Sequence, residues 1–120
     1  MTKEKALLLE KKNPAAHFCP VMTTLEVIGG KWKPAILWEL RQHRVRRFGA
    51  LKRALPGITQ KMLTQQLREL EADGIIHRKV YAEVPPRVEY TQTEYGRSLT
   101  PILEEMAHWG MKHQGTNQKN

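Results

Sequence analysis

The segment at residues 59–73 constrains the fold of this chain more than any other. Thr59 is a good N-cap at its beginning, and Gly74 is a helix stop signal directly after it. Three apolar residues recur at helical spacing and define one side that other elements must bury: Leu63, Leu67 and Leu70. The segment therefore predicts an amphipathic helix that packs on a hydrophobic core.

The opposite side of this predicted helix carries polar residues of the types that read the base edges of DNA. An arginine can bond guanine through two hydrogen bonds, a glutamine can bond adenine, and a threonine methyl can contact the thymine methyl. We expect the following residues to contact DNA: Thr59, Gln60, Lys61, Thr64, Gln65 and Arg68. Because the outer side of any amphipathic helix is polar, a plain solvated surface is the alternative.

Positive charge is concentrated around this helix. The chain has 20 Lys and Arg residues against 12 Asp and Glu residues, a formal net charge of +8 at pH 7. Residues 31–68 hold ten of the basic residues and only one acid, Glu39, which gives this stretch a net charge of +9. Such a concentration of positive charge attracts polyanions. The alternative is a solvated basic surface that binds no partner.

A second helix is predicted directly upstream, at residues 46–55, where apolar residues recur at i, i+3 and i+7. Pro56-Gly57 then forms the turn between the two helices. Four basic residues of the upstream helix are expected to contact phosphates and to set the register on DNA: Arg46, Arg47, Lys52 and Arg53.

The pattern changes after residue 74. Two runs rich in β-forming residues, 75–81 and 88–91, flank a loop that contains Pro85 and Pro86, and together they predict a β-hairpin. Arg87 lies near the tip of this hairpin, where it would reach the minor groove or the backbone of bound DNA. A merely solvated arginine is the alternative.

The remaining helices are predicted at residues 3–12, from Thr23 or Thr24 to Ile28, at 33–42 and at 93–112. Together the elements predict an α+β fold, mainly α, of the winged helix-turn-helix type with extra N-terminal and C-terminal helices. We expect a single domain at 1–113, with the helix-turn-helix at about 46–73, the wing at about 75–92, the C-terminal helix at about 93–112 and a flexible tail at 114–120.

Composition excludes several classes of protein. A chain of 120 residues fits one domain, and no stretch approaches the roughly 20 apolar residues of a membrane span. The N-terminal apolar run is too short for a signal peptide, and the single cysteine cannot form an intrachain disulfide, so we expect a cytoplasmic protein. No catalytic triad, carboxylate pair, dinucleotide fingerprint or metal-ligand set is recognisable, so we expect no enzyme, cofactor or metal.

The chain resembles the HxlR-type winged-helix transcription regulators, relatives of the MarR regulators. The stretches that match follow one another in order between residues 19 and 96: Cys19-Pro20-Val21, Ile28 to Lys33, Arg47 to Leu51, Leu55 to Leu70, Asp73-Gly74, Val84 to Tyr90 and Thr93 to Gly96. The resemblance implies a DNA-binding homodimer with contacts from its N-terminal and C-terminal helices. It also implies that residues 59–73 are the recognition helix and residues 75–92 the wing.

The sequence departs from the family pattern at two places. Ala50 stands where the family often has an acid. His43-Arg44-Val45-Arg46 replaces a more usual glycine-containing turn, which leaves the end of the helix at 33–42 uncertain.

Apolar stripes at the two ends of the chain support a homodimer independently. The candidate interface residues are Leu7, Leu8, Leu99, Ile102, Leu103, Met106 and Trp109. Some of them can instead pack on the chain's own core. A C₂ dimer would read two half-sites of an inverted repeat about one helical turn, ~34 Å, apart on double-stranded DNA.

Cys19 is the last candidate site, and it resembles the N-terminal cysteine with which several family members sense oxidants or electrophiles. Lys31 and Lys33 are expected to lie near enough to favour its thiolate, whereas a buried and inert cysteine is the alternative. The sequence thus predicts a homodimeric, sequence-specific DNA-binding regulator, responsive to oxidants if Cys19 is reactive. The alternative is a winged-helix protein-docking or thiol-sensor module without sequence-specific DNA binding. The sequence identifies no small-molecule effector.

Overall fold

The computed structural model describes residues 19–119, and its chain divides into two units at residues 31 and 32. The helix predicted at residues 3–12, with Leu7 and Leu8, lies outside the described residues. Within residues 19–119 no helix is both long and apolar enough to cross a membrane.

The described part of the first unit is one helix, α3 (Pro20–Ile28). It begins at Pro20, earlier than the predicted caps Thr23 and Thr24, because proline suits the first helical position and Cys19 occupies the N-cap. The hydroxyl of Thr24 donates to the carbonyl oxygen of Pro20 at 3.3 Å instead of capping a helix. The predicted stop is confirmed, since the chain leaves the helix at Gly29.

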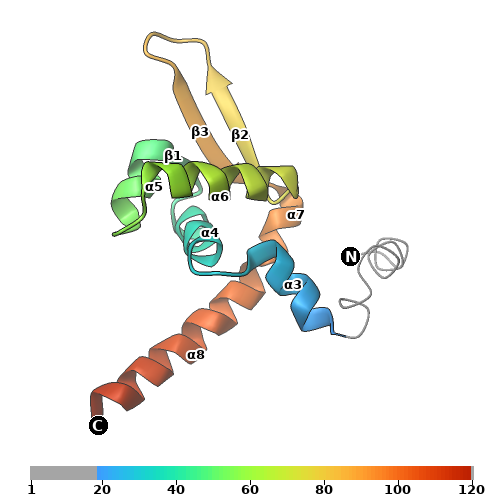
Figure 1. The fold of residues 1–120 in the computed structure, drawn as a ribbon, viewed down its shortest axis with the longest axis vertical. Coiled ribbons are helices and arrows are strands. Elements are labelled where there is room, and N and C mark those ends of the chain that lie inside the picture. Colours follow the sequence, from blue (N-terminus) through green and yellow to red (C-terminus); the bar gives the residue numbers. More distant parts are fainter. Residues whose placement is uncertain (1–18, 120) are drawn as a thin grey trace. The chain divides into compact units, whose positions relative to one another are not determined.

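Three helices form the body of the second unit: α4 (Trp32–Gln42), α5 (Phe48–Ala54) and α6 (Gln60–Ala72). Helix α4 packs against α5 and α6, and Figure 1 shows α6 lying across it. The largest fully buried side chains come from these helices and from the base of the wing: Ile36, Leu37, Leu40, Leu51, Leu63, Leu67, Leu70, Ile75 and Ile76. The predicted apolar side of residues 59–73 is therefore confirmed as core.

A three-stranded antiparallel sheet follows in the order β1-β3-β2, formed by β1 (Val45–Arg47), β2 (Ile76–Tyr81) and β3 (Arg87–Gln92). The predicted hairpin is confirmed as β2 and β3, which extend well beyond α6 (Figure 1).

The prediction of a helix from Arg46 was wrong, because β1 occupies the start of that range. Arg44 turns the chain with a φ of 35°, and β1 then pairs with β3 from Val45 opposite Thr91 to Arg47 opposite Glu89. Backbone hydrogen bonds to a strand more than 40 residues later replace the local helical pattern.

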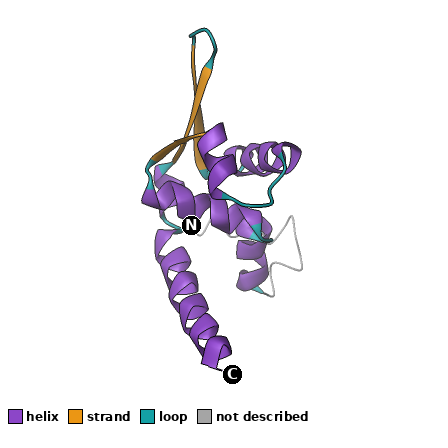
Figure 2. Ribbon diagram, turned by 90° about the vertical axis from the view of Figure 1, so that its left-hand side faces the viewer, coloured by secondary structure: helices purple, strands orange, loops and turns teal. Residues whose placement is uncertain are grey.

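The single helix predicted at 93–112 is two helices, α7 (Glu94–Arg97) and α8 (Thr100–Lys119). Thr93 caps α7 by accepting from the backbone N–H of Gly96 at 2.8 Å. Pro101 has no N–H to continue that helix, but it fits the first turn of a new one. Helix α8 continues through residues 114–119, where the sequence predicted a tail. Within the second unit, the hairpin and α8 project in opposite directions (Figures 1 and 2).

Candidate DNA-binding surface

Helix α6 carries five of the six predicted DNA-contacting residues, and the sixth, Thr59, is its N-cap. Leu63, Leu67 and Leu70 are at most 2% exposed, so the helix cannot rotate without exposing them. Gln60, Lys61, Gln65 and Arg68 are exposed, Thr64 is half-buried, and the N-cap Thr59 is exposed. Several of these side chains line one depression of about 650 Å³: Gln60, Lys61, Thr64, Gln65, Arg68 and Glu69.

The turn before α6 is fixed by local hydrogen bonds. The backbone N–H of Ile58 donates to the carbonyl oxygen of Leu55 at 3.1 Å, and Gly57 takes a φ of 92° that other residues rarely adopt. The hydroxyl of Thr59 then accepts from the backbone N–H of Met62 at 3.1 Å, which confirms the predicted cap. The first turn of α6 therefore begins at a defined point of the surface.

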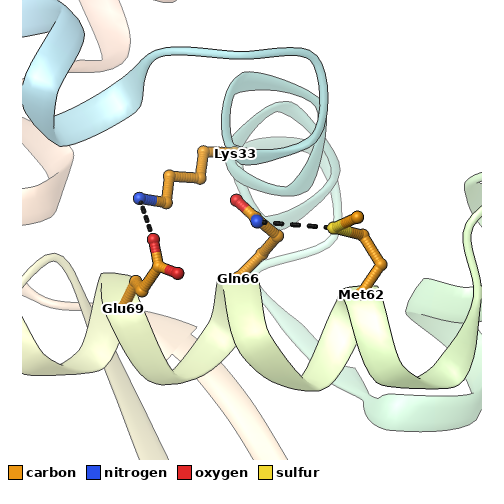
Figure 3. Close-up of polar contacts among 4 residues, drawn as sticks. All are labelled: Lys33, Met62, Gln66 and Glu69. Atoms are coloured by element: carbon orange, nitrogen blue, oxygen red, sulfur yellow. Dashed lines mark hydrogen bonds and ion pairs between the residues drawn. The ribbon is translucent and has the colours of Figure 1, made fainter.

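An ion pair joins the flank of α6 to α4. Lys33 is only 8% exposed, and its Nζ lies 2.7 Å from Oε1 of Glu69, as Figure 3 shows. On the same flank the Nε2 of Gln66 lies 3.6 Å from the sulfur of Met62 (Figure 3). The hydrogen bond and charge of Lys33, followed by a hydrogen bond from Gln65, hold the pKa of Glu69 below its ordinary value of 4.5.

The four predicted phosphate-contacting residues are divided between two elements. Lys52 and Arg53 are exposed in the last turn of α5, as predicted. Arg46 and Arg47 lie on β1 and not on a helix. The guanidinium of Arg46 is 3.6 Å from Glu39 and only 28% of its side chain is exposed, whereas Arg47 is exposed.

Arg87 lies at the start of β3, and its charge is engaged within the hairpin. Its guanidinium stacks on the ring of Tyr81 with 3.8 Å between the guanidinium carbon and the ring centroid. The same group lies 3.2 Å from Glu83 and 3.8 Å from Glu89. In this conformation Arg87, which the sequence predicted to contact DNA, is paired with two carboxylates of its own chain.

The sequence interpretation missed Arg78, which lies on β2 beside α6. It pairs in register with Tyr90, which is 7% exposed, so both residues belong to the helix-facing side of the sheet. Arg78 lines a cleft of about 380 Å³ together with residues of α6 that include Gln60 and Arg68. The sequence did contain a signal for this position. Arg78 follows the buried Ile76 by two residues, and residues two apart on a strand lie on the same side of the sheet.

The predicted dimer stripe on α8 is only partly available. Leu103 is 3% exposed and α8 packs on α4, which removes this residue from the predicted interface. Leu99 is half-buried. In contrast, Ile102, Met106 and Trp109 are 44%, 47% and 67% exposed. These three side chains line a mainly apolar depression of about 590 Å³ on this helix.

Cys19, the predicted sensor, is a half-buried free cysteine at the N-cap of α3 in the first unit. Of the two lysines expected to favour its thiolate, Lys33 is bonded to Glu69 in the second unit. Within the described residues no group of three potential metal-ligating side chains is close enough to hold an ion.

The helix pair, the exposed polar side of α6 and the hairpin define a winged helix-turn-helix protein. A model of the HxlR-like helix-turn-helix family matches residues 27–118, so the chain belongs to this family. It is 62% identical over 105 residues to the HTH-type transcriptional regulator YtcD of Bacillus subtilis strain 168, which covers 88% of this chain and 80% of YtcD. Family membership makes it a transcriptional regulator rather than an enzyme.

Two solved structures of a redox regulator are similar in fold and sequence. The oxidized form of HypR is 55% identical with a TM-score of 0.75, covering 78% of this chain and 96% of that one. The reduced form is 50% identical with a TM-score of 0.78, covering 84% and 99%.

Proposed function

We propose that this chain is a cytoplasmic transcriptional regulator that binds a specific DNA operator as a homodimer. The observation that supports this proposal most is the division of α6 into two sides. One side is fixed in the core by leucines that are at most 2% exposed, and the other presents Gln60, Lys61, Gln65 and Arg68 to solvent. A rigidly held helix with exposed bonding groups suits the major groove.

The neighbouring elements would hold this helix in register. Lys52 and Arg53 on α5, with Arg47 on β1, would contact phosphates, which position the protein without reading sequence. Arg78 on β2 borders the same cleft as Arg68, so we assign it a backbone contact beside the recognition helix. Arg87 would contact DNA only after leaving Glu83 and Glu89.

The first test is a footprint on the DNA upstream of the protein's own gene, at physiological salt with excess nonspecific competitor. A protected inverted repeat is expected. Arg68→Ala should then lose about 1–3 kcal/mol of discrimination at one base position of each half-site. A docking module without sequence-specific binding would protect no site and would be indifferent to this substitution.

A second variant pair separates phosphate contacts from net charge. Arg53→Ala should weaken binding to all sequences and reduce the slope of log K against log salt by about 0.9 per protomer. Lys112→Ala removes the same charge from the exposed surface of α8, away from α6, and should leave the slope unchanged. Equal effects of the two substitutions would contradict a defined phosphate contact at Arg53.

We infer that the dimer forms through the side of α8 that carries Ile102, Met106 and Trp109. Exposed apolar groups of this size at one helix side are typical of an interface. Met106→Lys should shift the protein toward the monomer in sedimentation equilibrium. Met111→Lys is the matched control, because Met111 is 70% exposed but lies about 140° away around the helix. Dissociation by both variants or by neither would contradict this interface.

We further propose that oxidation of Cys19 controls DNA binding. This proposal is supported by the 55% identity to the redox regulator HypR and by the position of the half-buried free thiol of Cys19 at the N-cap of α3. Because the sequence has one cysteine, a disulfide would be intermolecular. Two thiols would lose two protons and two electrons to hydrogen peroxide, which becomes two waters. Peroxide should change operator affinity of the wild type but not of Cys19→Ser, and an equal response of both would refute the role of Cys19.

A further inference from the structure

Lys33 carries the one positive charge that is buried among the described residues of the second unit. It lies in the first turn of α4, and its side chain is 9% exposed. An ammonium group in such a place is costly unless a carboxylate compensates it. Glu69 supplies that carboxylate through its 2.7 Å contact with Lys33, so the buried ammonium group holds the Glu69 side chain in place.

Glu69 extends from this buried contact to the DNA-facing side of α6. Its side chain is 44% exposed, and it lines the same 650 Å³ depression as Gln65 and Arg68. Gln65 precedes it by four residues, so the two side chains are neighbours about 40° apart around the helix. Besides the buried ammonium, the neighbouring Gln65 side chain also lowers the pKa of the Glu69 carboxylate, as a hydrogen-bond donor one helical turn away does.

A hydrogen bond between these two neighbouring side chains can have only one direction, and that direction determines which end of the Gln65 amide faces outward. An ionised carboxylate only accepts hydrogen bonds, so the Nε2 group of Gln65 must be the donor. The Oε1 atom is then left as an acceptor on the DNA-facing side, with one N–H of the amide still available. In the major groove, adenine and cytosine offer an exocyclic amine to such an acceptor, and adenine also offers N7 to the N–H.

We propose that Lys33 and Glu69 are positioning residues that fix the orientation of the Gln65 amide, so that Gln65 selects a base with an exocyclic amine, adenine above all. This inference rests on the proposed sequence-specific binding of DNA by α6. Without the pair, the Gln65 amide can rotate by 180°, and its Nε2 group can then also donate to the acceptors of guanine or thymine. Lys33 and Glu69 thereby determine specificity without contacting DNA themselves.

The test is selection of bound sequences from a library of random double-stranded DNA, followed by sequencing. The wild type should enrich one motif, and Gln65→Ala identifies the position that Gln65 reads. At that position the wild type should prefer adenine or, second, cytosine. If the wild type enriches no motif, the proposed function fails; if it enriches one with guanine or thymine at this position, only the present inference fails.

Glu69→Gln tests the pair itself, because a neutral amide can donate to Gln65 as well as accept from it. It should reduce the base preference at the Gln65 position by about fivefold, the lower end of the discrimination by a bidentate contact. The preference at the position marked by Arg68→Ala should stay as in the wild type. Glu71→Gln, on the same helix but about 120° from Gln65, should leave the Gln65 position unchanged.

A purely structural role of the pair would give a different result. It would weaken every position of the motif equally, which would refute the positioning role. If Glu69→Gln or Lys33→Met does not fold, the double variant Lys33→Met with Glu69→Leu replaces the ion pair by apolar groups, which folded proteins often tolerate. The double variant should bind DNA with the same loss at the Gln65 position alone, and an unaltered motif would overturn the proposal.

Discussion

Gly96 lies at the closest approach of α7 to the base of the wing, which makes Gly96→Ala a sharp test of this packing. An ideal Cβ at this position would overlap the carbonyl oxygen of Ile75 and lie 2.9 Å from its carbonyl carbon and 3.2 Å from its Cγ2. Ile75 is 2% exposed, so its backbone has little room to retreat. The substitution must therefore push α7 and the wing base apart.

The expected loss in the free energy of unfolding follows from the contacts that this displacement weakens. Overpacking of a buried site by one methyl group costs about 1–3 kcal/mol. The same Ile75 carbonyl oxygen accepts from the backbone N–H of Thr93 at 3.0 Å, and it lies 3.1 Å from the Thr93 hydroxyl, which also donates to the carbonyl oxygen of Gly74 at 2.6 Å. Weakening one of these bonds adds about 0.5–1.5 kcal/mol. We expect Gly96→Ala to lower the free energy of unfolding by about 2–4 kcal/mol, a large part of the usual 5–15 kcal/mol.

Urea unfolding followed by tryptophan fluorescence, at one protein concentration for all variants, measures this loss. Gly115→Ala is the matched control, since Gly115 lies in α8 and a Cβ there would meet nothing within 4 Å. It should be stabilising by up to about 1 kcal/mol, because glycine is unfavourable inside a helix. A loss below about 1 kcal/mol for Gly96→Ala would refute the tight contact with Ile75.

Three further predictions concern the backbone, the recognition helix and pH. Arg44 adopts a φ of 35°, so Arg44→Val should lower the free energy of unfolding by about 1–2 kcal/mol while Arg44→Gly should not, as thermal unfolding can check. Thr59→Ala should cost about 1 kcal/mol through loss of the cap on the N–H of Met62, and Thr59→Ser should retain it in the same assay. Because Lys33 lowers the pKa of Glu69, their pair stabilises the fold above the ordinary value of 4.5 and loses its effect as the pH falls below it. The difference in urea midpoint between wild type and Glu69→Gln should therefore shrink from pH 7 to pH 3.

Helix α6 and the hairpin could be predicted because their signals are local. Thr59 and Gly74 mark the two ends of α6, and leucines at helical spacing mark its buried side. The hairpin follows from β-forming residues around two prolines. In contrast, β1 depends on pairing with β3 more than 40 residues away, and nothing within residues 45–47 specifies that partner. The division between α7 and α8 did have a local signal, Pro101. The regular spacing of the apolar residues instead favoured one continuous helix, and the prediction followed that spacing.

Lys33 shows why the charge of a residue does not by itself indicate its role. The sequence interpretation counted it with the basic residues that would attract DNA. It stands at i, and Ile36, Leu37 and Leu40 follow at i+3, i+4 and i+7, so its spacing places it on the buried side of α4. A lysine in that position requires a carboxylate partner. The sequence could not identify which one, because Glu69 is brought near only by the crossing of α4 and α6.

The same distinction predicts the salt dependence of DNA binding. Within the segment of net charge +9, Lys33, Arg41 and Arg46 are paired with Glu69, Glu104 and Glu39 and should release few counterions. The exposed basic residues that we place at phosphates are Arg47, Lys52, Arg53 and Arg78. Four contacts per protomer in a dimer give a slope of log K against log salt of about −7, whereas counting every charge of the segment gives about −16. Titrations of a specific duplex between about 50 and 200 mM salt can separate these values. A slope steeper than about −12 would mean that the paired cations leave their carboxylates when DNA binds.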